Sequence, residues 1–158
     1  YVESMIQNNA ERNYFYSRNL FEDLIYGVTG KFVTLYSLWQ KTQLVAFEIV
    51  LHSGALSHSF LGATRYEFRT SQANTYLKIL LLKHLAENKI QTYYLGGGLI
   101  PNDGIFNYKK KYAPHSIESS YIESILFNEK IHKEILEFHL MENRQINKRR
   151  LQFYDIGP

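Results

Sequence analysis

Two runs of β-forming residues, joined by a short polar link, constrain the fold of this chain more than any other feature. The runs cover residues 32–39 and 44–51, and the link is residues 40–43. Both runs are rich in β-branched and aromatic side chains, and such a pair across a polar turn predicts an antiparallel hairpin. A third strand is expected at 57–63, after a short link at 52–54. A sheet therefore forms the centre of the predicted fold.

Helical patterns lie on both sides of these strands. The amino-terminal stretch, residues 1–26, is expected to be helical. Its second part, 18–26, has Ser17 as a predicted N-cap and Gly27 as its end. Residues 73–88 carry the strongest helical pattern, with an apolar stripe along one face. The stripe consists of Leu77, Leu80, Leu81 and Leu85, broadened by Ile79 and Leu82.

Short strands and helices alternate in the rest of the chain. A strand at 91–95 runs into three glycines, a helix follows at 103–112, and another strand is expected at 119–127. Asn128 is the predicted N-cap of a last helix, which ends near residue 143 and turns three apolar side chains inward. Those side chains are Ile131, Ile135 and Phe138. This order predicts an α/β (α+β) fold with a mixed, mostly antiparallel central sheet flanked by helices.

Composition limits the class of protein. The 158 residues, of which 45% are hydrophobic and 21% charged, suit a single globular domain covering residues 1–158. No apolar run is long enough for a membrane-spanning helix. The absence of cysteine excludes a disulfide scaffold and a cysteine nucleophile, and suits a cytoplasmic location. The net charge of +3 is a mild bias toward anionic partners rather than a nucleic-acid footprint.

The beginning of the chain bears on its completeness. It starts with Tyr1 rather than Met, and the first residues show no signal-peptide pattern. We therefore expect the sequence to be a piece of a longer protein or a processed product.

Three consecutive glycines mark the first candidate site. Gly96, Gly97 and Gly98 follow directly after the predicted strand, where they permit backbone paths closed to other residues and close approach of a ligand. The helix that follows offers unpaired N–H groups at its start. A turn without any ligand is the alternative. The pattern is neither the dinucleotide-binding fingerprint nor a Walker loop.

Lys109 is the sharpest single candidate. At about 100° per residue, it falls inside the apolar arc of its helix, whereas Lys110 and Lys111 point away. A lysine on a packed face is costly unless its ammonium meets an anion or a cleft, which makes it a candidate for charge stabilisation or proton transfer. The alternative is a lysine whose stem packs while its charged end reaches water. The arc consists of Ile105, Phe106, Tyr108 and Tyr112.

Other titratable residues carry less signal. Glu48 interrupts the apolar run at 44–51, and we expect it on the solvent side of an amphipathic strand rather than as a catalytic base. The six histidines are scattered, and none has the spacing of a zinc or calcium site. No metal site is predicted.

The segment from Leu95 to Tyr112 resembles the C-terminal signature of the Fem-type (FemAB-like) aminoacyltransferases, a branch of the GNAT-like acyl-CoA N-acyltransferase superfamily. The matching residues are Leu95-Gly96-Gly97-Gly98, then Asp103, then Ile105-Phe106-Asn107-Tyr108-Lys109. Tyr108 and Ile105 stand where Phe and Leu are commoner. Weaker similarity at 14–17, 21–24, 74–77 and 127–128 extends the resemblance over nearly the whole chain.

The resemblance implies an N-acyltransferase with a GNAT-like fold. Fem-type enzymes pass an aminoacyl group from charged tRNA to an amine of a peptidoglycan precursor. They usually carry two such domains, so a companion domain upstream is expected. By this likeness Lys109 and Tyr108 are the catalytic residues, with Lys109 stabilising an oxyanion or relaying a proton. The implied donor and substrate contacts are Leu95, Gly96, Gly97, Gly98, Asp103, Phe106, Arg69 and Asn74.

The acyl donor stays open between aminoacyl-tRNA and acyl-CoA, and no further cofactor is implied. CoA-binding members carry a glycine-containing loop before the central helix, but residues 69–74 contain no glycine. Arg69 and the helix start, which Ser71 or Asn74 is expected to cap, could still hold a phosphate. The alternatives are therefore a Fem-type enzyme, an acetyl-CoA-dependent enzyme acting on a sugar nucleotide or amino acid, and a non-catalytic half that binds precursor or partner domain.

Overall fold

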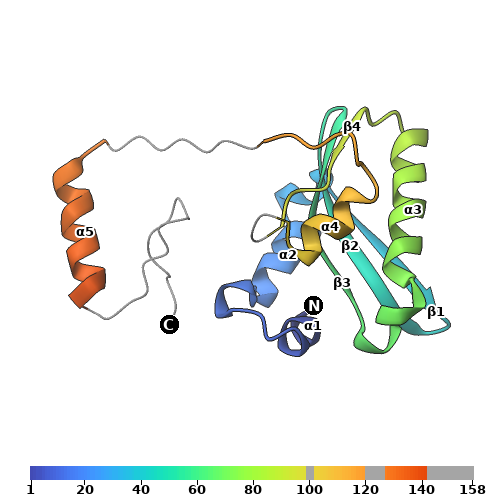
Figure 1. The fold of residues 1–158 in the computed structure, drawn as a ribbon, viewed down its shortest axis with the longest axis horizontal. Helices are drawn as coiled ribbons and strands as arrows, with labels where there is room; N and C mark the ends of the chain where they lie inside the picture. Colours follow the sequence, from blue (N-terminus) through green and yellow to red (C-terminus); the bar gives the residue numbers. More distant parts are fainter. Residues whose placement is uncertain (99–101, 120–126, 142–158) are drawn as a thin grey trace. The chain divides into compact units, whose positions relative to one another are not determined.

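The computed structural model describes residues 1–98, 102–119 and 127–141 (Figure 1). The chain divides into two units, Tyr1–His115 and Ser116–Pro158. The first unit contains all of the strands described and the predicted site residues, and the second contains one described helix.

Three strands form an antiparallel meander in the first unit. β1 (Val33–Gln40), β2 (Gln43–Ser53) and β3 (Leu56–Thr64) pair in chain order. Tight turns at 41–42 and 54–55 connect them. The predicted hairpin and third strand are confirmed, because the polar links lie where the sequence placed them.

β4 (Thr92–Tyr94) adds to β3 in parallel, which gives the sheet order β1-β2-β3-β4. A parallel neighbour requires a crossover, and α3 (Ala73–Glu87) supplies it. The pairing covers only Leu56–His58 of β3. Among the residues described, no strand pairs with β3 beyond this point on the β4 side. In the described part of the chain, residues 59–64 of β3 are therefore unpaired on the β4 side.

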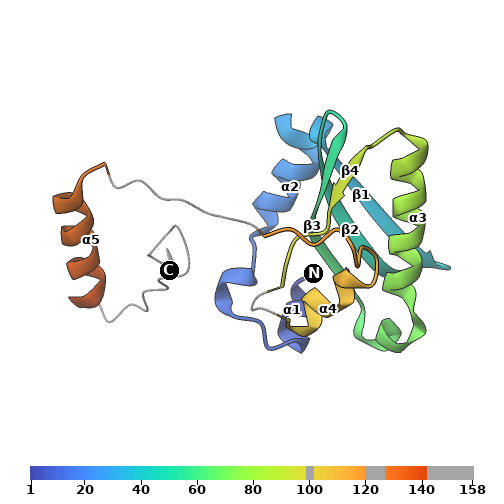
Figure 2. The ribbon, with the colours of Figure 1, turned by 45° about the horizontal axis from the view of Figure 1, so that its top comes forward.

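Helices surround the sheet, as Figures 1 and 2 show. Ser17 caps α2 (Arg18–Tyr26) by accepting a hydrogen bond from the Leu20 N–H at 3.3 Å, and Gly27 follows its last residue. Those two predictions are confirmed, but the stretch 1–26 is interrupted by non-helical residues. The remaining helical elements of the first unit are α1 (Val2–Gln7), α4 (Gly104–Lys110) and the 3-10 helices η1 (Arg12–Tyr14), η2 (Val28–Phe32) and η3 (Tyr66–Ser71).

α3 packs against β2 to form the core. Val50 contacts Leu81 and Leu85, and all three are buried. The predicted stripe was partly wrong, because Leu80 and Ile79 are exposed. The buried residues of α3 lie mainly four positions apart, on one narrow face that runs from the first turn of the helix to the last. The buried positions of α3 are Ala73, Leu77, Lys78, Leu81 and Leu85.

The start of α3 also differs from the prediction. Gln72 is the N-cap residue, in the left-handed region at φ 59°, and its side chain makes no capping bond. Ser71 is not a cap, because its Oγ donates to the carbonyl of Phe68 at 2.6 Å. Asn74 lies inside the first turn, where its side chain binds Tyr108 instead.

The second unit contains α5 (Glu129–Met141). Asn128 caps it as predicted, since its Oδ1 accepts from the Ile131 N–H at 3.0 Å. Ile131, Ile135 and Phe138, which were expected to face inward, are exposed within this unit, so the helix does not bury them against other residues of the same unit. Most of the predicted strand at 119–127 lies outside the described residues.

The predicted fold class is confirmed: helices flank a mixed, mostly antiparallel sheet. In the described parts of the chain, no helix has the length and apolar character that crossing a membrane requires.

Candidate functional site

The glycine turn and α4 are joined by the cap of the helix. Asp103 is the N-cap of α4, and its carboxylate accepts from the Phe106 N–H at 2.7 Å. The same carboxylate lies against Gly98, where an added Cβ would come within 2.1 Å of Oδ1. A side chain at position 98 would therefore displace the cap. Gly96 adopts φ +70°, which favours glycine.

Lys109 folds back from α4 onto this turn. Its Nζ donates to the Gly97 carbonyl at 2.9 Å and lies 3.4 Å from the place of a Cβ at Gly96. The side chain is half-buried, whereas Lys110 and Lys111 are exposed, as predicted. The helix wheel was wrong for Ile105, which is 47% exposed because the apolar contacts of α4 lie toward Phe106 and Tyr108.

The surroundings of Lys109 favour its neutral form. Burial lowers the pKa of Lys109 most, and the positive charge of Lys78 lowers it further. The carboxylates of Glu48 and Asp103 oppose this shift. The pKa of Lys109 thus depends on burial and on charged groups from three elements.

Tyr108 is the second predicted catalytic residue, and α3 holds its hydroxyl. Asn74 Nδ2 donates to the Tyr108 oxygen at 2.9 Å, and the Tyr112 hydroxyl donates to it at 2.8 Å. Burial, followed by Tyr112, raises the pKa of Tyr108 above its ordinary value. The hydroxyl therefore stays protonated and keeps a hydrogen that it can donate.

Glu48 corrects a prediction. It was expected on a solvent side of its strand, but it is only 4% exposed. Its Oε1 accepts from Lys78 Nζ, from the Tyr93 hydroxyl and from Ser59 Oγ, the last at 2.6 Å. β2 lies between β1 and β3 in the sheet, and α3 covers the face of β2 that carries Glu48. That face is therefore not exposed to solvent. The apolar residues on both sides of Glu48 were the available signal, because a strand buried on both faces lacks the alternation of apolar and polar residues.

Lys78 is the residue that sequence reasoning missed. It is 5% exposed, pairs with Glu48 and donates to the Tyr93 hydroxyl at 3.2 Å. Burial lowers the pKa of Lys78, and Glu48 opposes the shift. Burial and Glu48 raise the pKa of Tyr93. The sequence contained a signal for this burial, because at about 100° per residue Lys78 lies on the same side of the helix as Leu85, which belongs to the apolar stripe.

The structure brings together most of the residues named from the resemblance. The glycines, Asp103, Phe106, Lys109 and Tyr108 meet around the turn, and Asn74 joins them from α3. Leu95 is half-buried between β4 and the glycines. Arg69 has other contacts, because its Nη2 donates to Asn8 Oδ1 at 2.6 Å and its guanidinium lies 4.9 Å from the centre of the Tyr66 ring.

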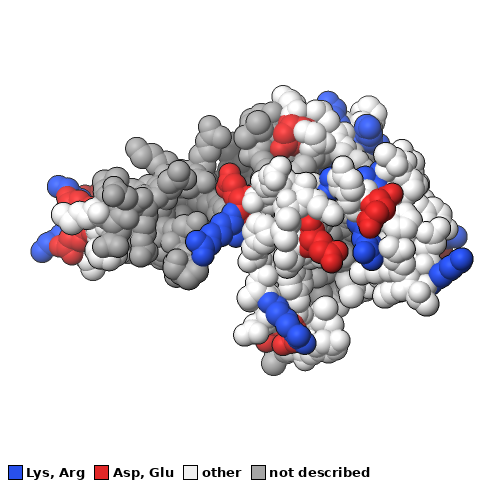
Figure 3. All heavy atoms as spheres, turned by 90° about the horizontal axis from the view of Figure 1, so that it is seen from below, with Lys and Arg blue, Asp and Glu red and all other residues white. Residues whose placement is uncertain are grey.

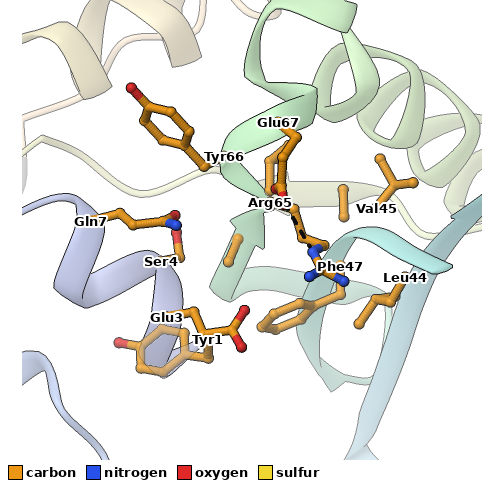
Figure 4. Close-up of a pocket in the computed structure, with 13 residues that line it drawn as sticks. Tyr1, Glu3, Ser4, Gln7, Leu44, Val45, Phe47, Arg65, Tyr66 and Glu67 are labelled. Carbon is orange, nitrogen blue, oxygen red and sulfur yellow. Dashed lines mark ion pairs between the residues drawn. The ribbon is translucent and has the colours of Figure 1, made fainter.

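A separate pocket of about 140 Å³ lies between α1, η3 and the adjoining ends of β2 and β3 (Figure 4). Phe47 and Tyr1 form part of its wall, and Arg65 and Glu67 form an ion pair at 3.8 Å beside it. None of the predicted site residues lines this pocket.

Comparison with known proteins gives the family. Residues 2–110 match the family described as "Acetyltransferase (GNAT) domain". The chain belongs to this family. The match covers the sheet, the glycine turn and α4 up to Lys110, so the GNAT-like part of the resemblance is confirmed and the chain is an acyltransferase of this family. A search of curated protein sequences gives no significant match.

Solved structures share the fold. The aminoglycoside acetyltransferase meta-AAC0020 from an uncultured soil metagenomic sample, in complex with sisomicin, superposes with a TM-score of 0.58 at 8% identity over 80% of this chain and 86% of that one. The same enzyme in complex with trehalose gives 0.57 at 8% identity over 79% and 85%. The ribosomal-protein-alanine N-acetyltransferase of Brucella melitensis biovar Abortus 2308 gives 0.55 at 15% identity over 78% and 88%. At these identities the likeness shows the fold alone.

Proposed function

We propose that this GNAT domain is of the Fem type and transfers an aminoacyl group from tRNA to an amine, with Lys109 and Tyr108 at the reacting carbonyl. The observation that carries the proposal is the hydrogen bond from Lys109 Nζ to the Gly97 carbonyl. This bond connects the glycine triplet with Lys109, the two parts of the signature, which lie 12 positions apart in the sequence. The acceptor we propose is an amine of a cell-wall precursor, and a companion domain would precede this one.

The two side chains suit the steps of aminolysis. A neutral amine attacks the ester carbonyl, the new C–N bond forms, and the carbonyl oxygen becomes an oxyanion that the Lys109 ammonium can stabilise. The C–O bond then breaks, the nitrogen loses a proton, and the departing oxygen gains one. Tyr108, held by Asn74 and Tyr112, offers a hydrogen to that oxygen.

A specific observation favours acyl-CoA as the alternative donor. The β3 edge at 59–64 is unpaired on the β4 side among the described residues, and α3 begins without a side-chain cap. Unpaired backbone groups at these places could bind the amides and the diphosphate of a CoA molecule. In that case a C–S bond breaks in place of the C–O bond, and the thiolate takes the proton.

Surface charge bears on the tRNA donor. On the face of the first unit shown in Figure 3, lysines and arginines lie beside aspartates and glutamates. No continuous basic stripe appears on that face among the residues described. We therefore expect few phosphate contacts on that face.

Binding and transfer assays with both donors test the proposal. Binding of charged tRNA without binding of acetyl-CoA, together with transfer to a peptide amine, would support the Fem type. Calorimetric binding of acetyl-CoA with acetyl transfer would support the alternative. Failure of both donors, with Lys109→Ala unchanged in every ligand assay, would favour a non-catalytic half.

A further inference from the structure

A buried charged cluster lies under the site and has no part in the proposed chemistry. It consists of Glu48, Lys78, Tyr93 and Ser59, from four different elements. Both ionised members are almost fully buried, at 4% and 5% exposure. Desolvation of two charges opposes folding, and apolar replacements of buried ion pairs are often at least as stable. Stability alone is therefore a poor reason for this cluster.

The cluster connects to both catalytic candidates through short stretches of backbone. Tyr93 is in β4, four positions before Gly97, whose carbonyl holds Lys109. Lys78 follows Asn74 by one turn of α3, and Asn74 holds the Tyr108 hydroxyl. β4 has only three residues and a single neighbouring strand among the described elements, so the described residues restrain its end at few other points.

We propose that Glu48, Lys78 and Tyr93 are positioning residues of the acyltransfer site. The buried ion pair holds the Tyr93 hydroxyl, this contact fixes the end of β4, and the glycine turn beyond it presents the Gly97 carbonyl to Lys109. The inference deepens the proposed function and rests on it for the catalytic consequence. The positioning itself is measurable without any substrate.

Charge supports the same assignment. The groups that act on Lys109 are Lys78 from α3, Glu48 from β2 and Asp103 at the start of α4. Lys78 lowers the pKa of Lys109, and Glu48 and Asp103 raise it. The ion pair thus supplies charges of opposite sign in fixed positions behind the site.

The test compares the reactivity of two neighbouring lysines. The intact chain is treated with a limiting amount of an acetylating succinimidyl ester, and modification at Lys109 is measured relative to exposed Lys110 by mass spectrometry. The double variant Glu48→Leu/Lys78→Met removes two charges whose effects on the pKa of Lys109 oppose each other. Its ratio should rise about threefold, the effect expected when an ordinary hydrogen bond is loosened. The matched control is Lys83→Met/Glu87→Gln, an exposed ion pair on the same helix with its charged atoms 3.9 Å apart, and it should leave the ratio unchanged.

A second variant decides the matter if the double variant does not fold. Tyr93→Phe keeps the ion pair and removes only the hydroxyl that ties it to β4, and it should raise the ratio in the same direction. A folded double variant, or a folded Tyr93→Phe chain, with the wild-type ratio would overturn the positioning role.

Transfer kinetics separate this inference from the proposed function. With whichever donor the wild type uses, the folded variants should lose kcat by about tenfold while KM for the donor changes little, as expected when transition-state contacts are misplaced. Equal kinetics in wild type and variants would overturn the inference. A changed labelling ratio in a chain whose wild type transfers no acyl group would support the positioning and refute the proposed function.

Discussion

Gly98→Ala tests the construction of the glycine turn directly. The added Cβ would lie 2.1 Å from Asp103 Oδ1 and 2.5 Å from its Cγ, far inside van der Waals contact. The Asp103 side chain has to move, and α4 then loses its cap. Loss of an N-cap lowers the free energy of unfolding by about 1 kcal/mol. Alanine has less conformational freedom than glycine in the unfolded chain, which raises the free energy of unfolding by about 0.4–1 kcal/mol.

Gly97→Ala is the matched control. A Cβ at Gly97 meets no atom within 4 Å, so this variant should keep only the favourable entropic term. We therefore expect Gly98→Ala to be less stable than Gly97→Ala by about 1 kcal/mol, which corresponds to a difference of about 4 °C in the melting temperature. Both alanines lie in the same exposed turn, so surface effects cancel.

The measurement is thermal or urea unfolding of both variants beside the wild type. Amide exchange should also be faster in α4 of Gly98→Ala, because its first turn is uncapped. Equal stability of the two variants would show that Asp103 does not depend on the absence of a side chain at position 98.

Three further predictions concern Lys109 and Ser17. Lys109→Met should keep the fold and reduce acyl transfer by about tenfold or more, whereas exposed Lys110→Met should transfer normally in the same assay. The pKa of Lys109 is lowered in the folded state, so between that lowered pKa and the ordinary lysine pKa of about 10.4 the unfolded chain binds more protons. The contribution of Lys109 to the free energy of unfolding therefore rises with pH across this window. Lys109→Met should therefore be relatively stabilised near neutral pH, with an advantage over wild type in urea unfolding that shrinks toward pH ~10.4, and an advantage independent of pH would contradict the shift. Ser17→Ala removes the cap of α2 and should lower the free energy of unfolding by about 1 kcal/mol in urea titration, and an unchanged midpoint would mean that the 3.3 Å bond contributes nothing.

Local features were within reach of the sequence. The caps by Ser17 and Asn128 depend on a bond between a side chain and an N–H three positions later, and both formed as predicted. The hairpin followed from side-chain periodicity and a polar link. The glycine triplet and the helix wheel singled out the glycine turn and Lys109, and the resemblance then implied a catalytic role for Lys109, which periodicity alone does not give.

Only the tertiary structure decided the environment of the site. Glu48 meets Lys78 across 30 positions and Tyr93 across 45, and Asn74 meets Tyr108 across 34. Periodicity within one element assigns a side chain to a face, but it does not say whether another strand or helix covers that face. For that reason the face of Glu48 was taken for solvent, although α3 buries it. The sequence by itself determined the strands, the main helices and the caps at Ser17 and Asn128, although it missed the start of α3 and the breaks within residues 1–26. The packing of distant elements determined which charges are buried beside Lys109.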